Sequence, residues 1–300
     1  MNHPAISIKK TADENLKGIL LHYNQAAARL LRSKSNIHNN IHDARLCFKR
    51  IRSLMRLGRF NFGEQNYNEL NLFYRDQARK LSSIRDITAM IELCEKMREI
   101  AKTDQIKKLI NHIRIDLIKK RKTLMAGQEV EKAKNEVIQS LTNQETVIKN
   151  LLFASGNNQQ LASGIRRVYQ SGRKLYKLSV KTTDDHNLHE WRKQVKYLWY
   201  QLVILTPLWP EILTPLCKQV QTLSQLLGKH HDYFIFANTL QSMKAENKYT
   251  HEIKALMTSI NSQKRNLEIK ALRLGAMLYI TSPRQIEQII KNLALQIKTS

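Results

Sequence analysis

The sequence is poor in the residues that interrupt helices. Only 9 glycines and 5 prolines occur in 300 residues, whereas Leu, Ile, Lys, Arg, Gln and Ala are abundant. Glycine and proline are the strongest breakers of regular structure, and the abundant residues are mostly good helix formers. The composition therefore predicts an all-α protein.

Cysteine and long apolar runs are also scarce. The three cysteines Cys47, Cys94 and Cys217 are far apart and outside any paired motif, which excludes a disulfide framework or a zinc knuckle. No stretch approaches the roughly 18 apolar residues of a membrane span, and residues 1–17 lack the apolar region of a signal peptide. We therefore expect a cytoplasmic protein that does not cross a membrane.

Acidic residues are outnumbered two to one. With 50 Lys and Arg against 25 Asp and Glu, the formal net charge is +25. Such self-repulsion is a cost to a compact chain, and it suggests a polyanionic partner: nucleic acid, a membrane surface or polyphosphate. The hydrophobic fraction of 42% is ordinary for a globular protein, so the charge lies on folded structure.

The motifs of common enzymes are missing. The sequence has no glycine-rich phosphate loop, no nucleophile elbow and no Asp-rich metal site, and His189 lacks the second histidine that a zinc protease helix would place at Lys193. His230 and His231 are adjacent, so on a helix they point in different directions, which does not favour a metal site. We expect no catalytic residue, no cofactor and no bound metal.

Amphipathic segments follow one another along the chain. Helical periodicity covers residues 16–32, 41–57, 66–80, 84–100, 105–124, 129–152, 161–180, 188–205, 210–226, 231–245, 251–279 and 283–297, with loops between them, including residues 58–63. The most linker-like stretch is residues 155–160, which read Ser-Gly-Asn-Asn-Gln-Gln. We expect an N-terminal half of residues 1–155 and a C-terminal half of residues 156–300.

The two halves share a repeated pattern. Gly18 corresponds to Gly164, and Asp86 to Asp232, each at a separation of 146 positions. The set His42, Arg45 and Lys49 recurs 147 positions later as His189, Arg192 and Lys196. This agreement indicates duplication. We expect two pseudo-symmetric helical bundles around a central basic channel. Each Asp follows a short loop, which favours a helix cap or a salt-bridge partner.

The repeated His, Arg and Lys residues are the main candidates for binding an anion. We call His42, Arg45 and Lys49 the first stripe, and His189, Arg192 and Lys196 the second. Positions i, i+3 and i+7 share one helix face, where like charges repel unless an anion lies against them. Arg52 and Arg56 extend the first stripe. The other interpretation is a solvated helix face, which duplication makes less favourable. Binding should tighten as pH falls through the histidine range.

These residues resemble the CHAD domain family of histidine-containing α-helical domains. The matching segments are residues 42–45 with 48–52, residues 189–193 with 196–200, residues 164–167 with Tyr169 and 172–173, and residues 227–228 with Asp232. The resemblance implies paired helical bundles with a basic channel that binds inorganic polyphosphate, and it suggests association with polyphosphate granules. Candidate contacts outside the two stripes and their extension are Arg50, Arg166, Arg167, Arg173 and Lys193.

The chain departs from the family pattern at Trp199, in residues 81–86 and at His231 before Asp232, and two alternatives stay open. Trp199 stands where the family usually has an arginine in the second copy, which removes one expected phosphate contact. The first alternative is an RNA- or DNA-binding protein without sequence preference, using the same basic surface and its interleaved aromatics. The second is an accessory or targeting subunit of a phosphate-handling enzyme.

Overall fold

The computed structural model describes residues 3–101, 103–243 and 249–298, and in these ranges the regular structure is helical, without strands. The prediction of an all-α protein is therefore confirmed. The elements are α1 (Ala12–Arg32), α2 (Ile37–Leu57), α3 (Arg59–Phe62), α4 (Glu64–Lys80), α5 (Ser82–Ile100), α6 (Asp104–Ala126), α7 (Gln128–Lys149), α8 (Gln160–Lys181), α9 (Asp185–Leu205), η1 (Thr206–Leu208), α10 (Pro210–Met243), α11 (Thr250–Leu278) and α12 (Pro283–Ala294).

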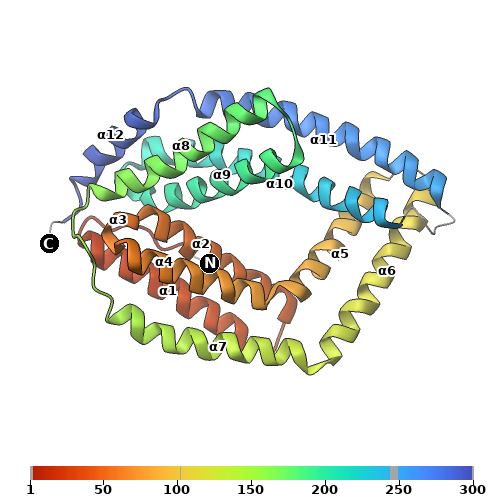
Figure 1. The fold of residues 1–300 in the computed structure, drawn as a ribbon, viewed down its shortest axis with the longest axis horizontal. Coiled ribbons are helices and arrows are strands. Elements are labelled where there is room, and N and C mark those ends of the chain that lie inside the picture. Colours follow the sequence, from red (N-terminus) through yellow and green to blue (C-terminus); the bar gives the residue numbers. More distant parts are fainter. Residues whose placement is uncertain (1–2, 102, 244–248, 299–300) are drawn as a thin grey trace.

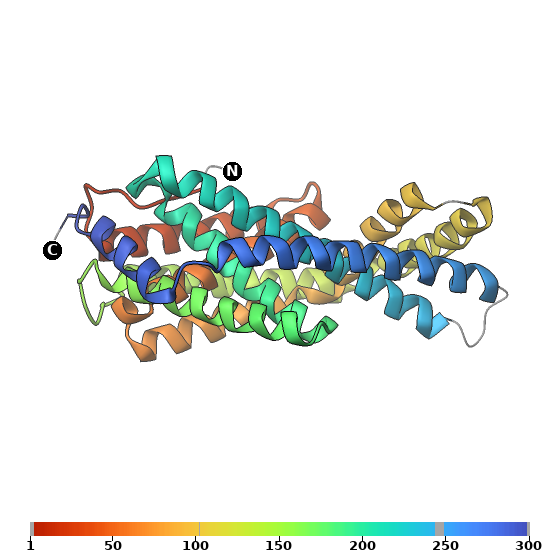
Figure 2. The ribbon, with the colours of Figure 1, turned by 90° about the horizontal axis from the view of Figure 1, so that it is seen from above.

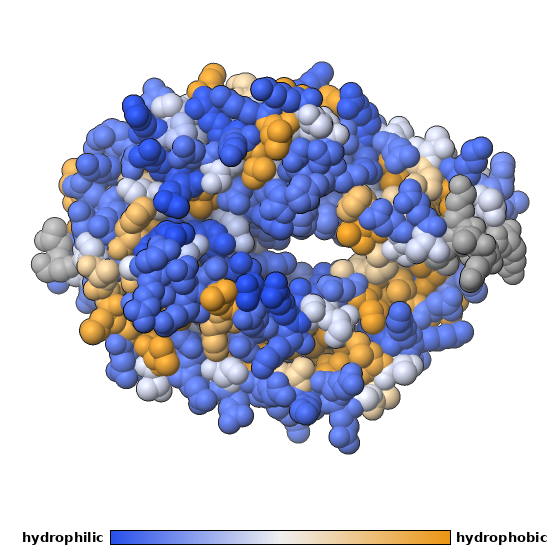
Figure 3. Space-filling model, viewed as in Figure 1, coloured by the Kyte–Doolittle hydropathy of each residue, from blue (hydrophilic) through white to orange (hydrophobic). Residues whose placement is uncertain are grey.

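The helices form an elongated ring (Figure 1). α1, α2, α4 and α7 make one side, and α8, α9, α10, α11 and α12 make the other. α5 and α6 leave the first side and reach the far part of α10 and α11, which extends beyond the main body (Figure 2). The space-filling view shows an opening between the two sides (Figure 3). The ring therefore encloses a space, which we call the central opening.

The two sides touch directly where α2 packs against α8 and α9. Gly164 of α8 lies so close to the end of α2 that an added Cβ would come within 1.8 Å of the Leu57 carbonyl oxygen. Ser53 Oγ of α2 donates a hydrogen bond of 2.8 Å to the Tyr197 carbonyl of α9. One continuous apolar core contains residues of both sides. These contacts bring the two stripe helices together.

The other end of the ring is closed by a smaller apolar cluster, which we call the clasp. It joins α5 and α6 of the first side to α10 and α11 of the second. Its buried members are Leu93, Cys94, Met97, Ile106, Leu109, Ile110, Ile113, Phe236, Ala237, Leu240, Ile253, Leu256 and Ile260. The central opening is thus bounded at one end by the main core and at the other by the clasp.

The prediction of a helix break near residue 227 is wrong. α10 runs unbroken from Pro210 to Met243, and the expected end at residue 245 lies outside the described residues. Gly228 weakens a helix by about 1 kcal/mol, but Leu227 and His230 beside it are buried at 2% and 3% exposure. Their tertiary contacts offset the poor helix propensity of the glycine.

The expected loop at residues 58–63 also contains a short helix, α3. Asn61 at its centre is fully buried and donates hydrogen bonds of 3.1 Å to the carbonyls of Ser155 and Asn157. These partners lie in the linker between the halves, far away in sequence. Local periodicity therefore gave no sign of this helix, because a distant segment stabilises it.

Cys47, Cys94 and Cys217 are free thiols, and burial raises the pKa of Cys47 and Cys94 to about 11. Over the described ranges, none of the helices combines the length and the apolar character needed to cross a bilayer.

Candidate anion-binding site

The first stripe lies on the side of α2 opposite the main core. Ile41 and Phe48 of the same helix are buried at 1% and 0% exposure. His42 and Arg45 are partly exposed, and Lys49 is more than a third exposed. The amphipathic spacing of α2 therefore gives the apolar residues to the core and leaves the stripe accessible.

The second stripe is held by a firmly anchored α9. Asp184 caps the helix by accepting a hydrogen bond of 2.7 Å from the Asn187 backbone N–H. Trp191, between the stripe positions, is fully buried and donates its indole N–H to the Tyr279 hydroxyl at 3.1 Å. The cap sets where the helix begins, and the buried indole sets its rotation. The stripe is thereby fixed on the remaining face.

The lysine ends of the two stripes converge. Partial desolvation lowers the pKa of Lys49 to about 7, and the largest electrostatic contribution comes from Lys196, followed by Arg45 and Arg192. Desolvation, with Arg192 and Arg50, lowers the pKa of Lys196 to about 8. Charges act on one another in this way only at short range. The structure thus brings the two stripes together, and within the described ranges Lys49 and Lys196 are in no ion pair.

The histidine of the first stripe borders α5. Desolvation and the positive charge of Arg85 lower the pKa of His42. Arg85 itself is paired with Glu92 through contacts of 2.9 and 3.2 Å. In the free protein His42 is therefore neutral near pH 7, and an approaching anion would favour its protonation.

The histidine of the second stripe contacts a second histidine. His189 Nδ1 lies 3.2 Å from His231 Nδ1 of α10, and the two ring centroids are 4.2 Å apart. Desolvation, with Arg192 and His189, lowers the pKa of His231 to about 3. At neutral pH His231 is therefore uncharged, and the tautomers of the two rings decide which Nδ1 donates the hydrogen bond. His231 thus orients His189, a role that the sequence did not predict.

Arg192 has unused hydrogen-bonding capacity. Its Nε is buried without a partner among the described residues, and it lies 3.7 Å from where a Cβ on Gly228 would be. Leaving a guanidinium donor unpaired in a low-dielectric site costs about 1–3 kcal/mol. An anion that accepts from this group would recover that cost.

Two carboxylates lie near the stripes. Burial raises the pKa of Asp232, although Lys96, Arg192 and Lys196 act in the opposite direction. Asp86 opposes the lowering of the Arg45 pKa. Both aspartates stand inside helices, so the expectation that they cap helix starts is wrong. Neither is in an ion pair within the described ranges. Their negative charges reduce the repulsion among the stripe cations without direct contact.

The extension of the first stripe is attached to α4. Arg45 donates to the Ala78 carbonyl. Arg52 Nε and Arg56 Nη1 both donate to Asn71 Oδ1, at 3.1 and 3.2 Å. The Arg56 guanidinium also stacks over the Tyr197 ring at 4.1 Å. These side chains are held in place without losing charge, because every partner is neutral.

Arg50 is separated from the stripe face by its aromatic neighbours. Its guanidinium lies 5.6 Å from the Tyr23 ring and 5.8 Å from the Tyr200 ring. Trp199 packs beside Tyr200 with ring centroids 5.0 Å apart. Arg50 still contributes charge, since it helps to lower the pKa of Lys196.

The remaining candidates lie on α8 and at the edge of the second stripe. Arg166 is paired with Glu287 of α12 at 2.8 Å, and Lys193 with Glu190 at 2.6 Å. Arg167 is exposed, with its guanidinium 6.0 Å from the Phe60 ring. Arg173 lines a different cavity, whose lining includes no stripe residue. Lys193 still acts electrostatically on His189, whereas within the described ranges Arg166, Arg167 and Arg173 form no hydrogen bond or ion pair with a stripe residue.

The neighbouring histidine, His230, belongs to a buried polar network. Its Nε2 lies 3.0 Å from Glu268 and 3.7 Å from Asp185, and Asp185 is paired with Lys264 at 2.7 Å. Within the described ranges, no group of three or more His, Cys, Asp or Glu is arranged to hold a metal ion. The network holds α9, α10 and α11 together.

The chain belongs to the CHAD domain family. The family model matches residues 17–241, which is most of the chain. The matched range includes both stripes. No curated protein matches the sequence.

Two solved structures share the fold. The crystal structure of the CHAD domain from the plant Ricinus communis has a TM-score of 0.65 and 15% identity, covering 93% of this chain and 96% of that one. PptA from Streptomyces chartreusis has a TM-score of 0.60 and 12% identity, covering 91% of this chain and 100% of that one. At such low identity, the likeness concerns the fold alone.

Proposed function

We propose that this protein binds inorganic polyphosphate along the two stripes and catalyses no reaction. The observation that carries the proposal is the convergence of Lys49 and Lys196, whose pKa values fall to about 7 and about 8. Cations held together against their mutual repulsion gain most from a ligand of high charge density. Membership of the CHAD family supports the same ligand.

A linear polyanion also suits the shape of the surface. From His42 to Arg56 the first stripe and its extension rise by about 20 Å along α2, at about 1.5 Å per residue. Arginine supplies a forked donor for phosphate oxygens, and lysine a mobile charge. The proposed contacts are His42, Arg45, Lys49, Arg52, Arg56, His189, Arg192 and Lys196, with Arg50 and Lys193 adding charge nearby.

The main alternative is a nucleic acid bound without sequence preference. Tyr197 is partly exposed at the junction of the two sides, where an aromatic ring can stack on a base. However, Arg56 already lies over this ring at 4.1 Å. The arrangement therefore favours backbone phosphates over bases, and polyphosphate over RNA or DNA.

A titration with sized polyphosphates at two salt concentrations tests the proposal. Affinity should fall with salt, because counterions are released, and it should rise with chain length until the stripes are filled. Single-stranded RNA of matched charge should displace polyphosphate poorly. Equal displacement by both polymers would contradict the proposed preference.

A pair of variants separates the stripes from net charge. Arg45→Ala with Arg192→Ala should weaken binding at least tenfold more than Lys291→Ala with Lys298→Ala, which removes the same charge near the C-terminus. Each charge-assisted contact contributes about 1.5–3 kcal/mol. Circular dichroism checks the fold of both variants. Similar losses would mean that net charge governs binding.

The cellular role follows from the same proposal. A polyphosphate-binding protein of this kind would occur in the cytoplasm with polyphosphate granules, or it would bring a phosphate-handling enzyme to its substrate. A pull-down that loses its partner after polyphosphate is digested would support the first role. A partner retained without polyphosphate would support the second.

A further inference from the structure

A third set of residues with the stripe spacing lies on α8. Gln170, Arg173 and Lys177 stand at positions i, i+3 and i+7, with Gln in place of His, and Lys174 adjoins them. From residue 160 to residue 181, α8 contains six Lys or Arg and no Asp or Glu. We call Gln170, Arg173, Lys174 and Lys177 the α8 patch.

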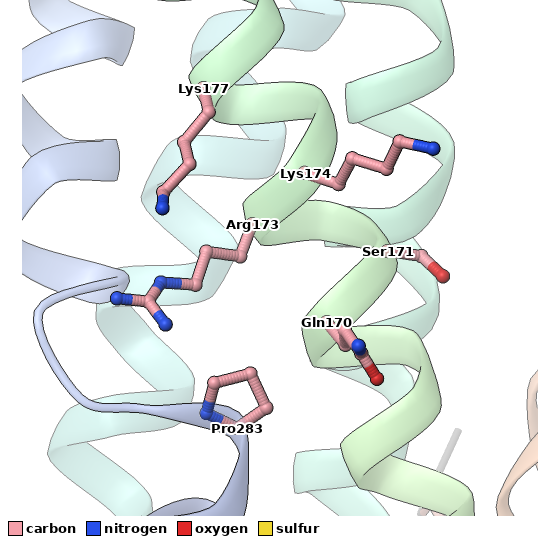
Figure 4. Close-up of a pocket in the computed structure, with 6 residues that line it drawn as sticks. All are labelled: Gln170, Ser171, Arg173, Lys174, Lys177 and Pro283. Atoms are coloured by element: carbon pink, nitrogen blue, oxygen red, sulfur yellow. The ribbon is translucent and has the colours of Figure 1, made fainter.

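The patch lines a surface cavity of about 610 Å³, within the range of about 300–1,000 Å³ usual for ligand pockets. Ser171 and Pro283 complete the lining. Figure 4 shows Arg173 and Lys177 pointing toward the segment that carries Pro283, while Lys174 points to the other side of α8. The polar lining residues are hydrogen-bond donors, and no acidic side chain lines the cavity.

In the part of the chain that the structure describes, the positively charged side chains of the α8 patch are not paired with acidic ones. Within the described ranges, Arg166 of α8 is paired with Glu287, but Arg173, Lys174 and Lys177 are in no ion pair. Arg173 Nε is buried without a hydrogen-bond partner. Arg192 of the second stripe likewise has a buried Nε without a hydrogen-bond partner.

The wall facing the patch is rigid. The Tyr169 hydroxyl lies 2.8 Å from the carbonyls of both Leu278 and Thr281, which fixes the linker between α11 and α12. Gly172 allows a close approach, since a Cβ there would meet the Tyr279 hydroxyl at 2.4 Å. A cavity with a fixed wall loses little entropy when it binds a ligand.

We propose that the α8 patch is a second anion site, separate from the stripes, which binds a segment of two or more phosphates. The ligand class rests on the proposed function, whereas the site itself rests on the cavity and its unpaired cations. A polyphosphate chain held by the stripes would then have a second contact on the outer surface. Affinity should therefore increase for chains long enough to reach both sites.

Calorimetric titration with tripolyphosphate tests the site, because so short an anion reports each site separately. The test variant is Arg173→Gln with Lys177→Gln, which removes the charge and leaves a shorter polar side chain. The matched control is Arg98→Gln with Lys108→Gln, exposed residues of α5 and α6. The wild type should show two classes of site. The test variant should lose one class, and the control should keep both.

A third variant, Lys49→Met with Lys196→Met, distinguishes the two proposals. If it abolishes binding while the α8 variant binds like the wild type, the second site is wrong and the stripe site stands. If only the α8 variant loses binding, the stripe site is wrong and the patch stands. Equal losses in the α8 variant and its control would overturn the patch, because net charge alone would explain them. The single variant Lys177→Gln, at an exposed position, checks the result if the double variant is unstable.

Discussion

Lys49 of α2 and Lys196 of α9 lie close enough that Lys196 is the largest electrostatic contributor to the low pKa of Lys49. The two residues are 147 positions apart and belong to different halves. Their proximity joins two helical stripes into one cationic surface. Because the two lysines repel one another, their proximity lowers the stability of the free protein and favours the binding of an anion.

The first prediction concerns that opposition. Lys49→Met with Lys196→Met removes the repulsion while keeping the apolar stems, so the free protein should become more stable. Because Lys49 is more than a third exposed, water screens part of the repulsion. We expect a rise of about 1–2 °C in Tm, the effect of about 1 kcal/mol in a chain of this length. Differential scanning calorimetry without ligand measures it.

The same variant should bind polyphosphate at least tenfold more weakly, since two charge-assisted contacts are lost. The matched control is Lys107→Met with Lys108→Met on α6, which should change neither property appreciably. A double variant that lost stability in the absence of ligand would show that the two lysines do not repel one another.

The second prediction is that binding takes up protons. In the free protein the pKa values are about 7 for Lys49 and about 8 for Lys196, and a bound polyanion raises them. The bound state therefore holds more protons above pH 7, so affinity should fall as pH rises from about 7 to 10. Calorimetry at pH 8 in two buffers of different ionisation enthalpy counts the protons. Identical heats in both buffers would contradict it.

The third prediction concerns acid stability. The pKa of His231 is lowered by desolvation from its ordinary value of 6.5 to about 3, so the unfolded state binds its proton first. This contribution to stability is complete above pH 6.5 and is lost as pH falls toward 3, by at most about 1.4 kcal/mol per pH unit. His231→Phe should move acid unfolding, followed by circular dichroism, to lower pH. His251→Phe, on the distant part of α11, is the control and should leave the midpoint unchanged.

The fourth prediction compares two glycines at matching repeat positions. Gly164→Ala should destabilise the protein by about 3 kcal/mol, because the new Cβ would lie 1.8 Å from the Leu57 carbonyl oxygen and α8 would have to move away from α2. Gly18→Ala should stabilise it by about 0.5–1 kcal/mol, since nothing lies within 4 Å of the new Cβ. Urea unfolding of both variants measures the contrast. Equal effects would contradict the close contact at Gly164.

The sequence was sufficient to predict what depends on spacing along one helix. The helical fold and the placement of His42, Arg45 and Lys49 on one face follow from periodicity alone. The repeat then suggested that His189, Arg192 and Lys196 face the same space. Positions 3, 4 and 7 residues apart have a fixed relation in any helix, so these predictions needed no knowledge of neighbours.

Features that depend on distant partners were not predictable in this way. Arg166 is paired with Glu287, which lies 121 positions away, and Arg56 is held by Asn71 and Tyr197. His231 was predicted to begin a new helix, yet it stands inside α10 and contacts His189. Packing decided each of these cases, and local periodicity contains no information about it.

The clasp gives the protein a topological property. A groove with a free end can be laid over the middle of a long polymer, but a ring closed by apolar contacts on both sides cannot. A chain passing through it must enter by one of its ends, or the clasp must separate and reform around it. A threaded polymer with bulky groups on both ends could not leave the ring while the clasp stays closed, however weak each contact is.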